Sequence, residues 1–355
     1  MGELSPSPSW LSPVSSSTLD QTLDLEIQPL ATYSVETDVP AGSLQGRVYI
    51  VTGGNVGIGL ELVKILYAGG ATIYIASRSK AKVEAAIQAI TSPSSNTPTT
   101  SGKLKFLHLD LNDPKTVTAA AASFAEQESK LDVLWNNAGT GANTVPLGER
   151  TAQDFELFIG RHCIATLLFT HLLLPQLRAA AAVASPDKGQ TRVIWTSSAL
   201  AEVGSPPNGI DWAVIDQGTN KLAQNYGVSK AGTWFLSREF ARRYKKDGIV
   251  SVCLNPGYLK TASFNGTPAL VMFIINRLML SESIYGAYTE LFAGLSPEVT
   301  LENSGAYIIP WGRVRPDSAT GRQDLIKAGA STEEGGLGYG AKLWEWCEKQ
   351  WAPYV

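Results

Sequence analysis

The fold is decided by the stretch RVYIVTGGNVGIG, residues 47–59. Its first five residues form a short apolar run rich in β-branched side chains, which predicts a buried strand. Glycines follow at once, and apolar residues with helical spacing (Ile58, Leu62, Ile65, Leu66) come next. Such a turn lets backbone N–H groups and a helix N-terminus approach a pyrophosphate. The spacing G-x-x-x-G-x-G differs from the generic fingerprint, so a plain strand–helix turn is the alternative.

Short apolar strands alternate with helices along the rest of the chain. Strands are expected at 47–51, 71–76, 104–107, 131–135, 192–196 and 249–254, with a final strand at 306–309. Helices are expected at 57–68, 80–90, 114–128, 152–182 with a kink at Pro175, 226–244, and in a Trp-rich segment that packs back near 343–348. Crossovers between such strands imply a parallel sheet. We therefore predict an α/β fold, a Rossmann-type doubly wound parallel sheet in a three-layer α/β/α arrangement.

The alternation has no obvious linker, which predicts a single domain over residues 45–355. Residues 1–44 form an N-terminal extension. Its first 20 residues are rich in Ser and Pro and are expected to be disordered. Residues 21–44 either drape over the domain or form an arm to a partner.

Composition excludes several classes of protein. The chain has 355 residues and a net charge of -3 without a basic stripe, which argues against a nucleic-acid partner. It begins without a secretory signal, and its most apolar stretch, 268–280, is too short for a transmembrane segment. Three widely spaced cysteines match no metal site and indicate a reducing, cytoplasmic location.

The end of the second expected strand bears on the choice of cofactor. A dinucleotide site for NAD usually has an acidic residue there for the ribose 2′-hydroxyl. This chain has Ala76-Ser77-Arg78-Ser79 instead. The Arg78 guanidinium could pair with a 2′-phosphate, which favours NADP(H). A surface arginine at a strand end is the alternative.

Tyr226 and Lys230 are four residues apart, so they lie on one face of the expected helix. A phenol has an ordinary pKa of about 10, and a neighbouring cation is expected to lower it. Tyr226 could then exchange a proton with a carbonyl or alcohol oxygen. The spacing alone is common, so an ordinary helix pair is the alternative.

In this order the motifs resemble those of the short-chain dehydrogenase/reductase family. The resemblance covers LQGRVYIVTGGNVGIG at 44–59, Asp110 after the third strand, NNAG at 136–139, the Tyr226/Lys230 pair, and the PG-x-x-x-T pattern at 256–261. It implies that Asp110 approaches adenine, that NNAG walls the ribose, and that the last segment orients the nicotinamide. The implied cofactor-binding residues are Gly53, Asn55, Gly57, Ile58, Gly59, Arg78, Asp110, Leu111, Asn137, Ala138, Gly139, Tyr226, Lys230, Pro256, Gly257 and Thr261.

The resemblance also implies three catalytic residues: Ser198, Tyr226 and Lys230. A serine hydroxyl at the fifth strand end would stabilise charge on the substrate oxygen, with Ser197 as the alternative to Ser198. Lys230 would also bind the nicotinamide ribose.

Two features depart from the family pattern. His162 stands where many members have an asparagine that supports a proton relay. Its ring either replaces that asparagine, since histidine titrates near neutral pH, or is simply packed. Ser198 and Tyr226 are also 28 positions apart, and the insert 202–225 resembles the retinol-dehydrogenase-like branch. We expect this insert to wall the substrate pocket, with Asp211 and Asp216 capping or solvated.

Residues 262–295 are expected to form an apolar substrate lid. The alternatives are a core segment, an oligomer interface, or a peripheral membrane contact. The C-terminal pattern resembles fungal family members, many of which modify secondary metabolites. The predicted function is an NADP(H)-dependent oxidoreductase that interconverts a carbonyl and an alcohol on a hydrophobic small molecule. The alternatives are a non-redox dehydratase or epimerase, and a catalytically silent NADP(H)-sensing protein. Homo-oligomers are common in the family.

Overall fold

The computed structural model describes residues 39–92, 102–141, 144–184, 189–259 and 281–355. Its centre is an eight-stranded sheet in the order β3-β2-β1-β4-β5-β6-β7-β8. The pairings are parallel as far as β7, and β8 pairs antiparallel with β7. The strands are β1 (Val48–Thr52), β2 (Thr72–Ser77), β3 (Lys103–His108), β4 (Val133–Asn136), β5 (Thr191–Thr196), β6 (Ile249–Leu254), β7 (Tyr307–Ile309) and β8 (Arg313–Arg315). The sheet reverses its order at β1 and β4, so the predicted doubly wound fold is confirmed.

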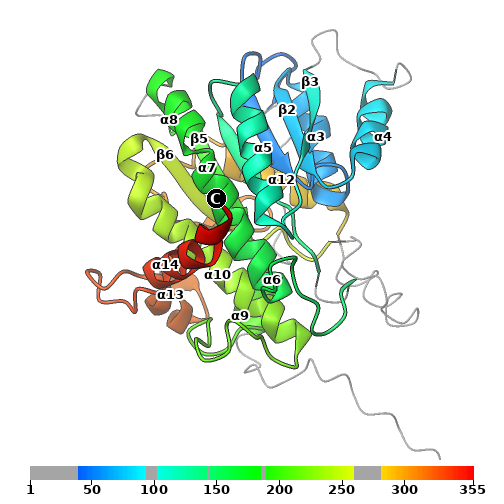
Figure 1. Ribbon diagram of the computed structural model, residues 1–355. Helices are drawn as coiled ribbons and strands as arrows, with labels where there is room; N and C mark the ends of the chain where they lie inside the picture. The colour runs from blue at the N-terminus through cyan, green and yellow to red at the C-terminus, as the bar shows by residue number, and fades with distance from the viewer. Residues whose placement is uncertain (1–38, 93–101, 142–143, 185–188, 260–280) are drawn as a thin grey trace, which may run out of the picture.

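Helices cover both faces of the sheet, which gives the three layers (Figure 1). One face packs against α5 (Pro114–Gln127), α7 (Thr166–Leu172), α10 (Leu222–Tyr244) and α14 (Tyr339–Trp351). The other packs against α3 (Gly57–Ala68), α4 (Lys80–Thr91) and α12 (Ser283–Leu295). The shorter helices are α6 (Leu157–Ile159), the π-helix η2 (Gly160–Ala165), α8 (Leu174–Val183), α9 (Leu200–Val203), α13 (Gln323–Gly329), and the 3-10 turns η4 (Lys245–Asp247), η6 (Asp317–Ala319) and η7 (Ala352–Tyr354).

Alternate residues of a strand point to opposite faces of the sheet, and each face has its own hydrophobic core. In β1, Ile50 belongs to the core under α5 and α10, whereas Tyr49 and Val51 belong to the core under α3 and α12. All five residues of β1 are buried. A strand buried on both faces needs the continuous apolar run that the sequence displays.

The helical region after β4 differs from its prediction. It begins at Leu157 rather than Ala152, and it bends by 53° between Leu172 and Leu174 rather than at Pro175. Pro175 lies in the first turn of α8, where a residue without an N–H is tolerated, so the break comes before it. Within the described residues, this bent pair has the length and composition of a broken membrane span, whereas no single helix does.

Two further boundaries differ from the sequence-based expectation. The helix expected from Tyr226 begins one turn earlier, at Leu222. The strand at Tyr307–Ile309 is followed by β8, which the sequence analysis did not anticipate. Arg315 of β8 forms a buried ion pair with Glu202, Nη1 to Oε1 at 2.9 Å. β8 has the sequence Arg-Val-Arg, so its single valine gave no apolar run, and the buried partner of Arg315 lies 113 residues away.

Most of the described part of the expected substrate lid is a core helix. α12 packs on α3 and the sheet, with residues such as Ala287, Leu291 and Ala293 fully buried. The expected lid therefore does not extend over residues 283–295, and residues 260–280 lie outside the described part of the chain. For α12, the alternative offered in the sequence analysis, a segment of the core, is the one that the structure shows.

Residues 39–46 pack against the end of α3. The Leu44 N–H donates to the Gly69 carbonyl at 2.8 Å, and the side chain of Val39 is buried. A Cβ on Gly69 would lie 2.7 Å from Leu44 and 2.8 Å from Val39. This part of the N-terminal extension therefore drapes over the domain.

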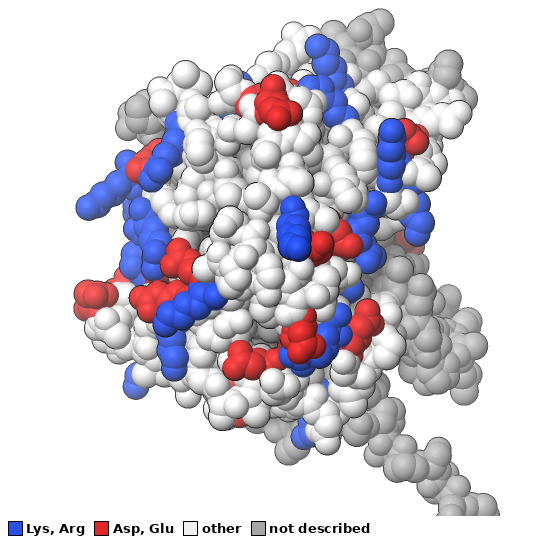
Figure 2. Space-filling view, in the orientation of Figure 1, with Lys and Arg blue, Asp and Glu red and all other residues white. Residues whose placement is uncertain are grey.

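The C-terminal helix α14 packs back onto α10, as predicted (Figure 1). It buries Leu343, Trp344, Cys347 and Trp351 against that helix and its neighbours. The three cysteines are free and buried. On the face drawn in Figure 2, basic and acidic side chains of the described residues are interspersed.

We expect Gly294→Ala to destabilise the fold, although alanine normally favours a helix interior. The added Cβ would lie 2.1 Å from Trp135 Cζ2, and overpacking of this kind costs about 1–3 kcal/mol. The free energy of unfolding in urea measures the effect. Trp135→Phe in the same chain makes room for the methyl group, so the penalty for Gly294→Ala is smaller in that background. Equal penalties in both backgrounds contradict the packing argument.

Candidate active site

The candidate catalytic and cofactor-binding residues come from the loops that follow β1 to β6, including Asp110 and Leu111 after β3, and from α10. Parallel strands end at one edge of the sheet, so these loops meet although they are far apart in sequence. Each strand end is fixed by backbone pairing, for example the Gly53 N–H to the Ala76 carbonyl at 2.8 Å and the Ser197 N–H to the Leu254 carbonyl at 2.7 Å. The sheet therefore sets the positions of the loops.

The glycine turn is tight on its inner side and open on its outer side. Gly53 and Gly57 have φ values of 68° and 56°, a region that L side chains rarely adopt. A Cβ on Gly59 would lie 2.6 Å from Asn137 Nδ2 and 2.7 Å from the Gly53 carbonyl, whereas one on Gly57 would meet nothing within 4 Å. The turn thus forms a cradle at the N-terminus of α3, which fits a pyrophosphate. Ile58 also packs toward α12, next to Gly286.

Thr52 joins this turn to the loop after β4, a role that the sequence analysis missed. Asn137 Nδ2 donates to the Thr52 carbonyl at 2.8 Å, and the Ala138 N–H donates to Thr52 Oγ1 at 2.8 Å. Thr52 Oγ1 in turn donates to the Trp135 carbonyl at 3.2 Å. A threonine closing a buried strand directly before two glycines was the available signal. The glycine turn and the Asn137–Gly139 segment are therefore built as one unit.

Cationic side chains gather where the sequence analysis predicted a 2′-phosphate. Arg78 is exposed directly after β2. Arg161 is mostly buried and donates from Nη1 to Thr140 Oγ1 at 2.8 Å. Burial, followed by the charge of Arg78, lowers the pKa of Arg161, so the two guanidinium groups are near enough to repel. Asp110, whose charge acts on Arg161, accepts the Asn112 N–H through Oδ1 at 3.0 Å. Arg161 escaped the sequence analysis because it sits on a helix beside His162.

Ser198, Tyr226 and Lys230 are brought together at the end of β5. The Ser198 hydroxyl is hydrogen-bonded to Tyr226. Lys230 Nζ lies 5.6 Å from the centre of the Tyr226 ring and donates to the Thr196 carbonyl at 2.9 Å. Ser197 points elsewhere, because its Oγ donates to the Lys230 carbonyl at 2.8 Å. The geometry favours Ser198 over Ser197 as the hydroxyl beside the tyrosine.

One electrostatic expectation was wrong. Burial raises the pKa of Tyr226 to about 12, although the hydrogen bond from Ser198 opposes the shift. Burial also lowers the pKa of Lys230 to about 8. Desolvation disfavours the charged form of each group, and it is the largest influence on the pKa of both. The phenol is therefore firmly protonated in this arrangement, as a proton donor to a carbonyl oxygen must be.

Glu290 of α12 is a buried carboxyl group near Lys230, and the sequence analysis missed it. Its Oε1 accepts from Thr196 Oγ1 at 2.6 Å, while Oε2 has no hydrogen-bond partner within the described part of the chain. Burial raises its pKa to about 7, against the effects of Thr196 and the Lys230 charge. Thr196 thus contacts both ionisable groups, the lysine through its carbonyl and the glutamate through its hydroxyl. One acidic residue within the apolar helix 283–295 was the available signal.

The loop after β6 supplies Pro256 and Gly257. Gly257 has a φ of 91°, and a Cβ there would lie 2.8 Å from the Trp311 ring. Its N–H donates to Asn255 Oδ1 at 3.0 Å. Glycine is therefore required at this turn. Thr261, the last residue of the expected pattern, lies outside the described residues.

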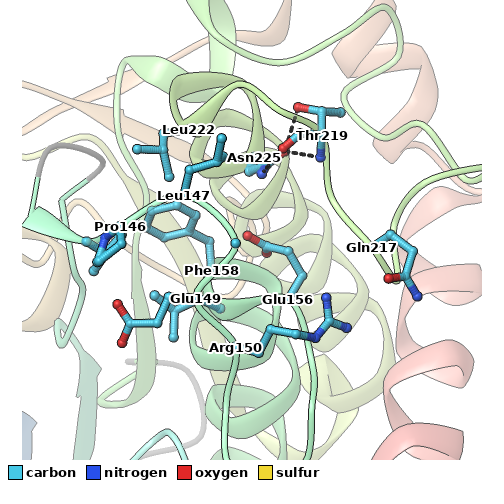
Figure 3. Close-up of a pocket in the computed structure, with 13 residues that line it drawn as sticks. Pro146, Leu147, Glu149, Arg150, Glu156, Phe158, Gln217, Thr219, Leu222 and Asn225 are labelled. Carbon is cyan, nitrogen blue, oxygen red and sulfur yellow. Dashed lines mark hydrogen bonds between the residues drawn. The ribbon is translucent and has the colours of Figure 1, made fainter.

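A cavity of about 70 Å³ lies beside the catalytic helix (Figure 3). Leu147, Phe158 and Leu222 supply apolar walls, and Glu156 and Asn225 add polar groups. The lining joins the loop after β4, the start of α6, the insert before α10, and the first turns of α10; it consists of Val145, Pro146, Leu147, Gly148, Glu149, Arg150, Glu156, Leu157, Phe158, Gln217, Thr219, Leu222 and Asn225.

This cavity adjoins the reaction site without containing it. Ser198, Tyr226 and Lys230 are outside its lining. The Phe158 ring links the two, because its centroid lies 5.6 Å from that of Tyr226. Four residues of the insert, Gln217, Thr219, Leu222 and Asn225, line the cavity, which fits the prediction that the insert forms a wall. Asp211 caps a turn, since its Oδ1 accepts the Ala213 N–H at 3.0 Å.

The fold and the site together define a dinucleotide-binding α/β protein with a serine, a tyrosine and a lysine at the sheet edge. Residues 47–210 match the family model for short chain dehydrogenase. A short-chain dehydrogenase/reductase from Pestalotiopsis fici, iacJ, is 48% identical over 336 residues, 94% of this chain and 98% of the relative. Another from Emericella nidulans, pkfC, is 36% identical over 90% of this chain and 97% of the relative. The chain belongs to the short-chain dehydrogenase/reductase family of oxidoreductases.

Solved structures agree on the architecture. The NADPH-bound carbonyl reductase from chicken fatty liver is 26% identical, with a TM-score of 0.56 over 77% of this chain and 99% of that one. The L-sorbose reductase from Gluconobacter frateurii is 20% identical, with a TM-score of 0.57 over 77% of this chain and 97% of that one. The second likeness concerns the fold alone.

We expect Glu290→Gln to change how stability depends on pH. The pKa of Glu290 is about 7 in the folded chain, against an ordinary value of 4.5. Folding therefore favours the protonated carboxyl, and the wild-type protein loses stability as pH rises from about 4.5 to about 7. This loss is on the order of 3 kcal/mol at most, and the glutamine variant lacks it.

Urea unfolding at pH 5 and pH 8 measures this difference. The variant should gain stability relative to the wild type at the higher pH. Glu84→Gln is the control, because its side chain is 58% exposed and the substitution should leave the pH dependence unchanged. The same pH dependence in the wild type and in Glu290→Gln contradicts the shifted pKa.

Proposed function

We propose that this protein is an NADP(H)-dependent oxidoreductase that interconverts a carbonyl and an alcohol on a hydrophobic small molecule. The observation that carries the proposal is the meeting of Ser198, Tyr226 and Lys230 at the sheet edge that also holds the glycine turn. A carbonyl oxygen beside the Ser198 and Tyr226 hydroxyls could accept hydrogen bonds from both.

Each residue then has a distinct part in the reaction. Bound NADPH supplies a hydride to the carbonyl carbon. The Tyr226 hydroxyl transfers its proton to the substrate oxygen, and Ser198 holds that oxygen in place. Lys230 provides a nearby positive charge that stabilises the phenolate left behind. In the oxidative direction, the phenolate takes the proton back from the alcohol.

Arg78 supports the choice of NADP(H). It follows β2 directly, at the edge where the ribose would lie, and Arg161 is near. Two guanidinium groups without an acidic residue at the strand end suit a 2′-phosphate. The cofactor-binding residues proposed from sequence, from Gly53 to Gly257, lie along the same edge. The NADPH named for the chicken carbonyl reductase agrees with this choice.

The proposed substrate class is argued from the cavity and from the fungal relatives. The apolar segment 262–275 that suggested a hydrophobic substrate lies outside the described residues. The cavity beside Phe158 is lined by apolar side chains together with charged and amide groups. The fungal relatives support the proposal of a role in secondary metabolism. A cytoplasmic location, a homo-oligomer and the retinol-dehydrogenase-like branch stay predictions.

Tyr226→Phe should lower turnover by about 10²–10⁴-fold, the usual contribution of a positioned proton donor. Oxidation of NADPH, followed by absorbance against a panel of aromatic and long-chain ketones and aldehydes, measures it. NADPH binding, measured by fluorescence, should change little. Tyr244→Phe, a partly buried tyrosine at the far end of the same helix, is the matched control and should retain full activity.

Two outcomes of this experiment contradict the proposal. Full activity of Tyr226→Phe removes the tyrosine from the chemistry. A substrate converted without stoichiometric consumption of NADPH points instead to a non-redox dehydratase or epimerase.

Arg78→Ala should raise the KM for NADPH by about tenfold to a hundredfold, because a charge-assisted hydrogen bond to phosphate contributes about 1.5–3 kcal/mol. The KM for NADH should change little. Steady-state kinetics with both cofactors measure the difference, with the exposed Lys82→Ala as control. Equal changes for NADPH and NADH, or none, contradict the assignment of Arg78 to the 2′-phosphate.

A further inference from the structure

We propose that His162 is a positioning residue that acts as a neutral imidazole with its proton on Nδ1, tying the loop after β4 to the catalytic helix α10. It holds Tyr226 in place and takes no part in proton transfer. This inference concerns the histidine that stands where the family resemblance led us to expect an asparagine.

The hydrogen bonds of His162 assign its tautomer. The Thr140 N–H donates to Nε2 at 3.2 Å, so Nε2 must offer a lone pair. Nδ1 lies 2.8 Å from Ser229 Oγ, and Ser229 Oγ donates its one proton to the Tyr226 carbonyl at 2.8 Å. The serine oxygen can then only accept from the histidine, which puts the ring proton on Nδ1. The chain of donors runs in one direction from Thr140 to the backbone of Tyr226.

Both ring nitrogens are therefore occupied, and the ring is 2% exposed. An imidazolium would direct an Nε2 proton at the Thr140 N–H. The charged groups that act on the ring are Lys230 from α10 and Arg161 from its own helix, and both are cations. Burial and these two charges lower the pKa of His162 well below its usual range. A ring that cannot gain a proton cannot pass one on.

The same ring packs directly against the tyrosine. The centroids of His162 and Tyr226 are 5.7 Å apart with the planes at 88°, and Phe158 meets Tyr226 at 5.6 Å and 89°. His162 and Phe158 lie 5.9 Å apart. Such edge-to-face contacts are favourable and fix ring orientation. His162 thus acts on Tyr226 in two ways. Its ring packs against the Tyr226 ring, and its Nδ1 bonds to Ser229, which in turn donates to the Tyr226 backbone carbonyl.

A local irregularity brings His162 to this place. Residues Gly160–Ala165 form a π-helix between α6 and α7, a feature often found at functional sites. Thr166 Oγ1 donates to the Arg161 carbonyl at 2.8 Å. A Cβ on Gly232 of α10 would lie 2.8 Å from Cys163 Sγ, so the two helices approach closely here. That approach lets the imidazole reach Ser229.

The tautomer can be read directly from the wild-type protein. The chain has three histidines, so long-range proton–nitrogen correlation spectra of ¹⁵N-histidine-labelled protein are simple. The signals that vanish in His162→Asn identify this ring. We expect a proton on Nδ1, with nitrogen shifts that stay constant from about pH 5.5 to pH 8.5. A proton on Nε2, or a titration in this range, overturns the proposal whatever the enzyme's substrate.

Kinetics test the positioning role, and this arm rests on the proposed function. His162→Ala and Ser229→Ala should each lower kcat for NADPH-dependent ketone reduction by about tenfold, as expected for loss of a buried hydrogen bond of about 1.4 kcal/mol. The double variant should be no slower than the slower single variant, because both break one chain. The acid limb of the pH profile should not move.

Cys163→Ala is the matched control. It changes the neighbouring buried residue of the same π-helix, whose Sγ donates to the Ser229 carbonyl at 3.4 Å, and it leaves the His162 bonds intact. Its kcat should stay within about twofold of the wild type. Additive losses in the double variant, unchanged rates in both single variants, or loss of an ionisation in His162→Asn contradicts the positioning role. If His162→Ala does not fold, Ser229→Ala and the spectra of the wild type still decide.

Discussion

The parallel pairing of β1, β4, β5 and β6 is the constraint on which the site depends. Parallel strands all end at one edge of the sheet, so the glycine turn, the Asn137–Gly139 loop, Ser198 and the Pro256–Gly257 turn are assembled there by backbone hydrogen bonds. Side chains then secure the assembly. Thr52 joins the first two loops, and Thr196 contacts Lys230 through its carbonyl. These contacts are short and buried or partly buried, so they hold the loops in place.

A consequence of this assembly is that ionisable groups are buried where the chemistry takes place. Lys230, Glu290 and His162 are each almost fully inaccessible. Desolvation disfavours the charged form of every one of them and of the Tyr226 phenol, so the imidazole is kept neutral and the phenol protonated. Hydrogen bonds with Thr196, Thr140 and Ser229 satisfy most of the polar atoms of these groups and offset part of the cost of burying them. Glu290 Oε2, which has no hydrogen-bond partner within the described residues, is the exception. We therefore expect the ionisation of Glu290 to affect the stability of the fold.

Local signals in the sequence predicted the regular parts of the fold well. The strand at 249–254 and the helix at 57–68 match their expected bounds, because continuous apolar runs and the glycine turn are unambiguous. Signals failed where a distant contact decides. β8 has a buried arginine paired with a residue 113 positions away. The bend before α8 lies ahead of Pro175, because this proline occupies the first turn of the new helix. The lid was expected over 262–295, yet residues 283–295 pack in the core, since an apolar wall and a core face have the same composition.

The sequence by itself determined the doubly wound fold, the family, and the residue types at the site: the glycine turn, Arg78 and the Ser198/Tyr226/Lys230 set. These are encoded by spacing within one strand, turn or helix, so neighbouring residues suffice to reveal them. Only the tertiary structure decided the electrostatics. Whether Lys230 lowers the pKa of Tyr226, or burial raises it, depends on how deeply both are enclosed by elements far away in the chain. The same holds for the tautomer of His162, which Thr140 and Ser229 fix from two different elements.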